Sequence, residues 1–275
     1  MVRIKTLVEN TSVSSEYGHK HGVSFYIETS SHKILFDVGP NDLFLENAKK
    51  MDVDISKVDT VIISHGHMDH AGALGLFLKE NNHAKVYIKK EAFEKHYTKV
   101  LALKVNISLD KKLQNHPQLI FTDDVFKIDD ELLLFSKKQE KSWGSKANTA
   151  LLAEINGRIV QDDFSHEQSL IIFDEQKRIL VSGCSHSGIV SIKDKAETII
   201  GEKVTHVIGG FHLYNPTSRQ YESDELITSV AKSLDDSQTC YYTCHCTGIK
   251  AFEKMKKVLG SSLNYTAAGN EIRLA

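Results

Sequence analysis

The sequence predicts a layered α/β fold of two similar halves, with two β-sheets packed face to face and helices on the outside. Two observations support this prediction. The strand-like pair at 169–174 and 178–183 resembles the pair at 24–28 and 33–38, displaced by 145 positions. The interval from Asp37 to His65 is 28 residues, and the interval from Cys184 to His212 is also 28. Chance similarity is the alternative, because a hairpin followed by a helix is a common order of elements.

Apolar runs and helical periodicity place the individual elements along the chain. We expect strands and helices in the first half as follows: strands at 4–8, 23–29, 33–38 and 58–64, and helices at 42–50 and 71–80. In the second half we expect a helix at 189–200 and a strand at 204–212. We interpret 91–134, which begins with a helical stretch at 91–97, as an insertion near the functional site of a single domain covering 1–275.

Composition limits the possible classes of function. The chain has 275 residues, 41% of them hydrophobic and 25% charged, as in an ordinary globular protein. The net charge of −2 gives no general attraction to nucleic acid or to an anionic membrane, so the expected partner is a small-molecule substrate. No run reaches transmembrane length, and the N-terminus lacks a signal-peptide pattern. Three of the four cysteines lie between 240 and 246 and form no disulfide framework, which predicts a reducing cytoplasm.

Four metal-ligand side chains directly follow the apolar run at 58–63, namely His65, His67, Asp69 and His70. Alternate side chains of an extended segment point the same way, so His65 and His67 can face one ion together. Asp69 and His70 stand where a helix begins and can face a second ion. Imidazole with carboxylate suits zinc or a related first-row ion. The alternative is a helix N-cap with exposed loop histidines. Six histidines without clustered partners are expected on the surface: His19, His21, His32, His83, His96 and His116.

Two later histidines, His186 and His245, also follow a strand and precede a helix, which predicts that they are ligands. Cys184 could add a thiolate ligand or be an inert buried thiol. Cys244 and Cys246, which flank His245, could instead hold a structural zinc. We expect two sets of ligands, one for each ion: mainly His65, His67 and His186 for the first, and Asp69, His70 and His245 for the second.

Four groups near these ligands have open roles. His166 and Glu167 precede the later strand pair, where either side chain could complete the first metal shell or contact substrate. Asp37 could orient a ligand histidine or be a turn aspartate. We expect His212 to point into the pocket as a hydrogen-bond donor to an oxyanion or phosphate. The lysines and the lone tryptophan of 136–144 could hold a phosphorylated or aromatic substrate, or belong to a solvated charged loop.

The pattern His-x-His-x-Asp-His, matched in full by residues 65–70, resembles the hallmark motif of the metallo-β-lactamase superfamily. The resemblance covers most of the chain and implies an αββα four-layer sandwich with a dinuclear metal site at the sheet edge. The family pattern has an isolated histidine before the later hairpin and a bridging aspartate after it, where this chain has His166-Glu167 and Cys184-Ser185-His186. Three segments resemble the branch of metal-dependent hydrolases related to the dihydropterin ribofuranosylaminobenzene phosphate synthase of methanopterin formation: 183–189, 209–213 and 245–248.

These features predict a hydrolase with two divalent ions, zinc by preference and manganese or iron as alternatives. Two ions that share a water would lower its pKa and create a hydroxide that attacks phosphorus or a carbonyl carbon. Asp69 would also orient the hydroxide, and His212 would stabilise the charge that develops on the substrate. A small phosphate-containing or phosphoribosyl substrate is expected from family analogy.

Two other classes of function stay open. A group-transfer synthase would use the metals to organise a pterin or phosphoribosyl substrate without net hydrolysis, and a non-catalytic protein would only bind or sense metal. A redox di-iron centre is disfavoured, because oxygen-reducing relatives usually carry an acid where this chain has Met68. RNA processing is disfavoured because a strong basic signature is missing from the sequence.

Overall fold

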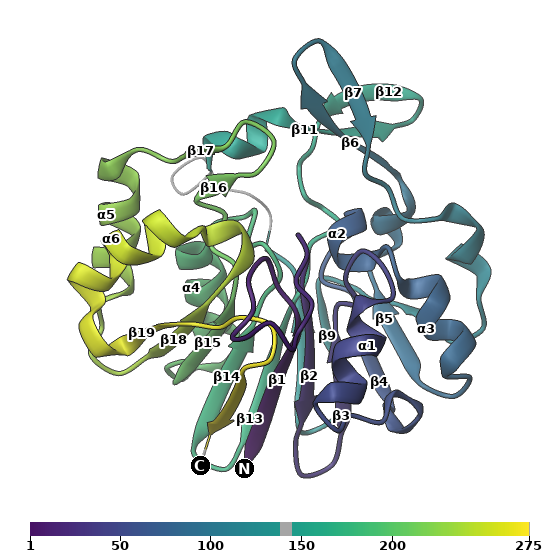
Figure 1. The fold of residues 1–275 in the computed structure, drawn as a ribbon, viewed down its shortest axis with the longest axis horizontal. Coiled ribbons are helices and arrows are strands. Elements are labelled where there is room, and N and C mark those ends of the chain that lie inside the picture. The colour runs from purple at the N-terminus through teal and green to yellow at the C-terminus, as the bar shows by residue number, and fades with distance from the viewer. Residues whose placement is uncertain (138–144, 275) are drawn as a thin grey trace.

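Two seven-stranded sheets form the centre of the protein in the computed structural model, which describes residues 1–137 and 145–274. Both termini lie at the same end of these sheets (Figure 1). The order of the first sheet is β20 (Glu271–Leu274), β1 (Val2–Val8), β2 (Ser24–Glu28), β3 (Lys33–Phe36), β4 (Thr60–Ile62), β5 (Lys85–Ile88) and β8 (Leu119–Phe121). The order of the second is β19 (Leu263–Tyr265), β18 (Cys240–Thr243), β15 (His206–Gly209), β14 (Lys177–Val181), β13 (Ser169–Asp174), β10 (Leu132–Phe135) and β9 (Val125–Lys127).

The predicted internal repeat is confirmed by the strand pairing. In the first sheet β2 pairs antiparallel with β3, which pairs parallel with β4. In the second sheet β13 pairs antiparallel with β14, which pairs parallel with β15. The same local topology therefore places the end of β4 and the end of β15 at corresponding positions of the two sheets.

Helices cover the outer face of each sheet (Figure 1). The first sheet carries α1 (Leu43–Lys50) and α3 (Leu74–Glu80), and the second carries α4 (Ile189–Ile200), α5 (Asp224–Leu234) and α6 (Ile249–Leu259). The short helix α2 (Met68–Ala71) lies at the edge of the first sheet. No helix within residues 1–137 and 145–274 combines the length and apolar composition needed to cross a bilayer.

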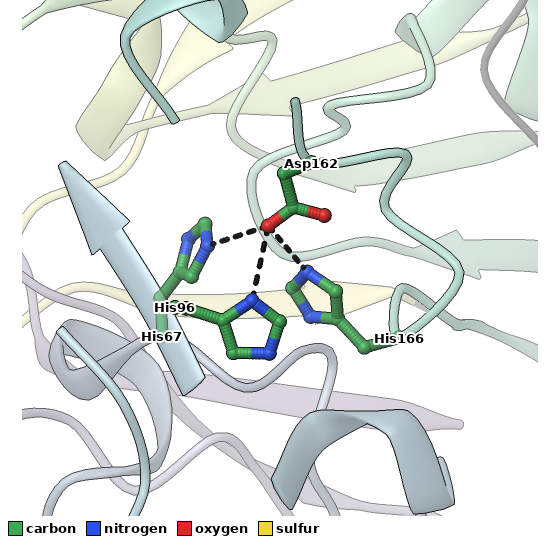
Figure 2. Close-up of side chains that lie close together, drawn as sticks. All are labelled: His67, His96, Asp162 and His166. Carbon is green, nitrogen blue, oxygen red and sulfur yellow. Dashed lines mark hydrogen bonds and ion pairs between the residues drawn. The ribbon is translucent and has the colours of Figure 1, made fainter. Parts of the chain in front are cut away.

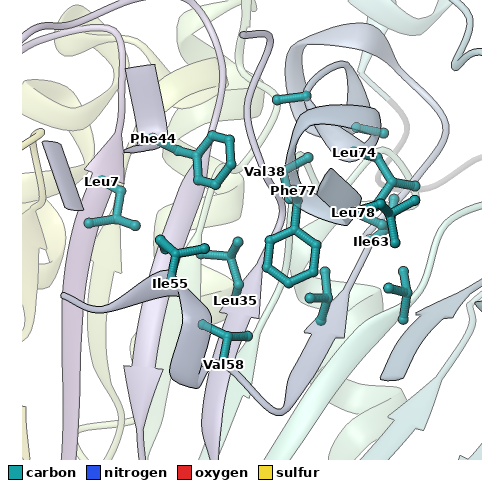
Figure 3. Packing of buried hydrophobic residues seen from close by; sticks show 14 of the residues in the cluster. Leu7, Leu35, Val38, Phe44, Ile55, Val58, Ile63, Leu74, Phe77 and Leu78 are labelled. Atoms are coloured by element: carbon teal, nitrogen blue, oxygen red, sulfur yellow. The ribbon is translucent and has the colours of Figure 1, made fainter. Parts of the chain in front are cut away.

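Three buried apolar clusters fill the spaces between the four layers of the fold. Alternate side chains of a strand face opposite sides of its sheet, so Phe25 and Ile27 pack between the two sheets while Tyr26 faces the helices. The cluster between the first sheet and its helices contains Phe44 and Phe77 (Figure 3). A matching cluster lies under α4, α5 and α6. These clusters confirm the predicted helix-sheet-sheet-helix architecture.

A third sheet projects beyond one end of the two main sheets (Figure 1). Its strand order is β12 (Arg158–Gln161), β11 (Leu151–Ile155), β6 (Lys95–Val100) and β7 (Leu103–Asn106). A two-stranded hairpin is formed by β16 (Tyr214–Asn215) and β17 (Gln220–Tyr221). Short 3₁₀ turns complete the described elements: Ile55–Lys57, Lys90–Phe93, Lys111–Asn115, Lys146–Ala150, His245–Thr247 and Gly260–Ser262.

Two predicted helices differ from the observed elements. The helix expected at 71–80 is interrupted before Leu74, where the Ala73 N–H donates to the Gly39 carbonyl at 3.0 Å. The helical stretch expected at 91–97 ends at Phe93, because the following residues pair with β11 as strand β6. The range 91–134, expected as an insertion, contributes strands to all three sheets.

Candidate metal centre

Loops at the ends of parallel strands bring the predicted ligands together at one edge of the sandwich. His65 and His67 follow β4, His186 follows β14, and His245 follows β18. Each of these four side chains is buried, with at most 4% of the residue exposed. Gly183 allows the halves to meet here, since a Cβ atom at this position would clash with the Ser64 side chain. Residues from both halves of the sequence therefore form one site.

The first group of candidate ligands is built around three imidazole rings. The ring centroids lie 4.6 Å apart for His65 and His67, 5.0 Å for His65 and His186, and 5.1 Å for His67 and His186. Rings that share one tetrahedral zinc, with Zn–N bonds of about 2.0–2.1 Å, have centroids about 5 Å apart. The Nε2 atoms of all three rings are buried without a hydrogen-bond partner among the described residues. This arrangement fits a divalent cation.

The second group contains His70, His245 and Asp69. The Nε2 atoms of His70 and His245 are 3.3 Å apart. An Asp69 carboxylate oxygen lies 3.5 Å from Nε2 of His70 and 3.2 Å from Nε2 of His245. Cys184 lies between the two groups, because its Sγ is within 4.8 Å of ligand atoms of His65 and His186 and of His70 and His245.

Asp37 orients one histidine of each group. Its carboxylate accepts a hydrogen bond from Nδ1 of His70 at 2.6 Å and from the Ser64 hydroxyl at 2.6 Å. Because the Ser64 proton points to Asp37, Oγ of Ser64 accepts from Nδ1 of His65 at 2.8 Å. These bonds turn Nε2 of both rings toward the candidate ligands. Nε2 of His65 has no hydrogen-bond partner among the described residues, whereas Nε2 of His70 lies 3.2 Å from Sγ of Cys184 and 3.3 Å from Nε2 of His245. Asp37 is therefore hydrogen-bonded to His70 directly and is connected to His65 through Ser64.

Side-chain amide oxygens fix the tautomers of the His186 and His245 rings in the same way. Nδ1 of His186 lies 3.0 Å from the side-chain oxygen of Asn148, and Nδ1 of His245 lies 2.8 Å from that of Asn10. An amide oxygen can only accept, so each ring carries its proton on Nδ1 and presents Nε2 as a lone pair. Neutral imidazole with a free nitrogen is the form that binds metal.

Buried glutamates fix the backbone beside these two histidines. Glu167 accepts from the His186 N–H at 2.7 Å and from the Ser187 N–H at 3.0 Å. Glu9 accepts from the His245 N–H at 2.7 Å. Both oxygens of Glu167 therefore hold the loop that carries His186. Burial raises the pKa of this carboxyl.

Asp162 lies close to His67 of the first group and to two further histidines, His96 and His166 (Figure 2). One oxygen lies 3.0 Å from Nδ1 of His96, 3.2 Å from Nε2 of His166 and 3.7 Å from Nε2 of His67. Nδ1 of His166 accepts the Gly66 N–H at 2.9 Å, so its Nε2 donates to Asp162. Both nitrogens of His166 are therefore engaged, and this ring connects Asp162 to the loop that carries His65 and His67.

The expectation that His96 lies on the surface is wrong, since only 1% of this residue is exposed. Strand β6 pairs with β11, and the alternation along β6 turns His96 inward while Lys95 stays exposed. Sequence reasoning also missed Asp162. The alternation at 95–98 is the signal that could have placed His96 inside, but nothing in the sequence connects it to Asp162.

The electrostatics of the site favour neutral rings in the first group and ionised carboxylates, but they do not favour a neutral His70. Burial alone would lower the pKa of His70, yet the neighbouring Asp69 and Asp37 carboxylates raise it to about 9. Burial, followed by the neighbouring His70 and His67, holds the pKa of His65 well below its usual value. Burial alone would raise the pKa of Asp69, but His70 and other nearby rings lower it well below its usual range. Burial also opposes ionisation of Asp162, yet His166 and the other rings around it keep the pKa of this carboxyl low.

His21 is exposed, as expected, but it approaches the second group of candidate ligands. Its side chain is 42% exposed, yet Nε2 lies 3.3 Å from Asp69 and the ring centroid lies 4.5 Å from that of His245. Among the other histidines expected on the surface, His32 and His116 are half-buried, whereas His19 and His83 are exposed.

His212 lies beside Cys184 and Cys246, with ligand atoms of the three residues within 4.8 Å of one another. Both of its ring nitrogens are buried and lack a hydrogen-bond partner in the described chain. Its φ of 49° is in the left-handed region, as is the φ of 50° at His245. Such backbone conformations are costly for residues other than glycine and cluster at functional sites.

A cavity of about 480 Å³ opens onto both ligand groups. His67, Asp69, His186, His212 and His245 are among the residues that line it. The cysteines are free, and Cys244 is buried in the core between the sheets. No cluster of metal-binding side chains in residues 1–137 and 145–274 includes Cys244.

Residues 138–144, with the lysines and tryptophan considered for substrate binding, lie outside the described residues.

Comparisons with known proteins agree with this geometry. The family model of the metallo-beta-lactamase superfamily matches residues 17–187. The 7,8-dihydropterin-6-methyl-4-(beta-D-ribofuranosyl)-aminobenzene-5'-phosphate synthase of Methanocaldococcus jannaschii is 31% identical over 270 residues, covering 91% of this chain and 89% of the relative. An uncharacterised protein of the same organism is 27% identical, covering 93% of this chain and 94% of that relative.

A solved structure extends the similarity to the whole fold. The crystal structure of Tm1679, a metal-dependent hydrolase of the beta-lactamase superfamily, matches with a TM-score of 0.85 and 27% identity over 100% of both chains. The predicted family resemblance is confirmed by these matches and by the four-layer architecture. The chain therefore belongs to the metallo-β-lactamase superfamily.

Proposed function

We propose that the protein is a hydrolase in which two divalent metal ions, zinc by preference, activate water against a small phosphate-containing or phosphoribosyl substrate. The observation that carries this proposal is the position of Cys184, whose Sγ belongs to both groups of ligand atoms. Two groups that share a ligand atom suit a pair of neighbouring ions. His65, His67 and His186 would hold mainly one ion, and Asp69, His70 and His245 the other.

The bound ions would act as Lewis acids and bring the pKa of a water close to neutrality. The chain's own residues supply orientation and charge. Asp69, ionised and facing His70 and His245, would orient the water. His212, with both ring nitrogens unpaired among the described residues, would donate to the charge that develops on the substrate.

A group-transfer synthase is the second candidate. The relative that is 31% identical over most of both chains carries the name of a synthase, which favours this class over a protein that only binds metal. In a synthase the same residues would orient two reactants without net hydrolysis. The two candidates differ in the product released, so one assay separates them.

Metal removal tests the proposal. Protein stripped with a chelator and reloaded with Zn²⁺, Mn²⁺ or Fe²⁺ is screened against phosphomonoesters, phosphodiesters, lactones and thioesters, following release of phosphate, alcohol or thiol. We expect turnover to disappear on stripping and to return with added metal. A condensed product without release would favour the synthase. Turnover that survives stripping, or no turnover with any metal, would contradict the proposal.

A further inference from the structure

The cavity lining combines candidate metal ligands with apolar side chains. Met68, Ile107 and Leu151 form its apolar wall, and Pro40, Thr98, Ala147, Asn215, Pro216 and Thr217 also line the cavity. Met68 is 44% exposed, which is high for a large apolar side chain beside a polar centre. The cavity therefore offers both histidine and carboxylate side chains and hydrocarbon.

The apolar wall of Met68, Ile107 and Leu151 carries no charged side chain. Within residues 1–137 and 145–274, no lysine or arginine lines the cavity, and the one carboxylate in the lining, Asp69, is a candidate metal ligand. An anionic group placed against the wall would lose water without gaining a cation, which is strongly unfavourable. An uncharged ring placed there would instead bury apolar surface, which is favourable. Any phosphate on the substrate would therefore lie at the candidate metal ligands and not against Met68, Ile107 and Leu151.

The apolar wall is fixed to the metal-binding loop. The Met68 N–H donates to the Ile107 carbonyl at 2.8 Å, and His67 forms an isolated β-bridge with Ser108. Oγ of Ser108 in turn accepts the His96 N–H at 2.8 Å, which ties this segment to β6. Because these bonds join the wall to the ligands by backbone contacts, the apolar surface has a set position relative to the reacting end of a substrate.

We propose that the part of the substrate that does not react is an uncharged apolar or aromatic ring system, held against Met68, Ile107 and Leu151. The orientation of the reacting group toward the metal ligands rests on the proposed function. The affinity of the apolar wall for an uncharged ring does not rest on the proposed function, because this binding needs neither metal nor turnover.

The test is a binding measurement on stripped, metal-free full-length protein. The probe is N-phenyl-1-naphthylamine, an uncharged aromatic dye whose fluorescence rises in apolar surroundings, and ribose 5-phosphate is the anionic competitor. Leu151→Lys places a charge in the wall. Leu103→Lys is the matched control, because Leu103 is 71% exposed on the same four-stranded sheet and does not line the cavity.

We expect the wild type and Leu103→Lys to bind the dye equally, and Leu151→Lys to bind it at least about tenfold more weakly. Circular dichroism and thermal unfolding are used to check that all three variants are folded. Leu151→Gln, which is uncharged, should bind the dye more tightly than Leu151→Lys. Absence of dye binding to the wild type, equal binding by Leu151→Lys, or displacement of the dye by ribose 5-phosphate would overturn the proposal. Binding without any hydrolysis would leave this inference standing while the proposed function fails.

Discussion

Replacing His67 with alanine is expected to lower metal-dependent turnover by about 10³-fold or more, because loss of one of three first-ion ligands weakens both metal binding and water activation. The His67 ring lies 4.6 Å from that of His65 and 5.1 Å from that of His186. Its Nε2 also lies 3.7 Å from a carboxylate oxygen of Asp162, so the variant also loses the contact between the first group of candidate ligands and Asp162. Steady-state kinetics at saturating metal measure the effect.

The control for His67→Ala is His83→Ala. His83 is an exposed histidine of the same half and is absent from the described clusters of candidate ligands. We expect this variant to keep the turnover and metal content of the wild type. If His67→Ala turned over substrate as fast as the wild type, the proposed site would be wrong.

Replacing Asp37 with alanine is expected to destabilise the metal-free protein by about 3 kcal/mol, since it leaves buried partners of a carboxylate unpaired. Those partners are the Ser64 N–H, the Ser64 hydroxyl and Nδ1 of His70, all within 2.7 Å of a carboxylate oxygen. Metal affinity should fall about 10–100-fold, as is typical when a group that orients a ligand histidine is lost.

Urea unfolding and metal competition titrations measure the two effects of Asp37→Ala separately. Asp42→Ala is a suitable control, because Asp42 is exposed and its side chain makes no capping hydrogen bond to α1. Asp37→Asn, which retains an acceptor for Ser64, should lie between Asp37→Ala and the wild type in stability. An Asp37→Ala protein with wild-type metal affinity would show that Asp37 does not orient the ligands.

Much of the fold follows from local patterns in the sequence. The two hairpins repeat at a fixed displacement, and both give an antiparallel pair followed by a parallel strand. The helix expected at 189–200 agrees with α4 residue for residue. Its boundaries are predictable because the amphipathic period ends at Gly201, whose φ of +70° closes the helix.

The third sheet could not be predicted in the same way. Strands β6 and β7 are joined by two residues, but β11 and β12 come about fifty residues later and pair with them only in three dimensions. That long-range pairing buries His96 against Asp162. Local periodicity does not indicate which distant strands pair. The sequence therefore did not predict that His96 and Asp162 lie beside the candidate ligands.

The candidate ligands were easier to predict than the residues that support them. A ligand histidine is marked by its place after a strand, as for His186 and His245. The partners that set its tautomer, such as Asn148 and Asn10, lie 38 and 235 residues away and have no motif of their own. Similarly, the engagement of both nitrogens of His166 depends on the Gly66 N–H, which only the folded chain brings close.

The most direct test of the two-ion account is an anomalous-scattering map, recorded at the zinc edge from crystals of zinc-loaded protein. The account predicts two peaks in the buried edge, one among His65, His67 and His186 and one among Asp69, His70 and His245, with Cys184 beside both. A single peak, or zinc bound only among His96, Asp162 and His166, would contradict it.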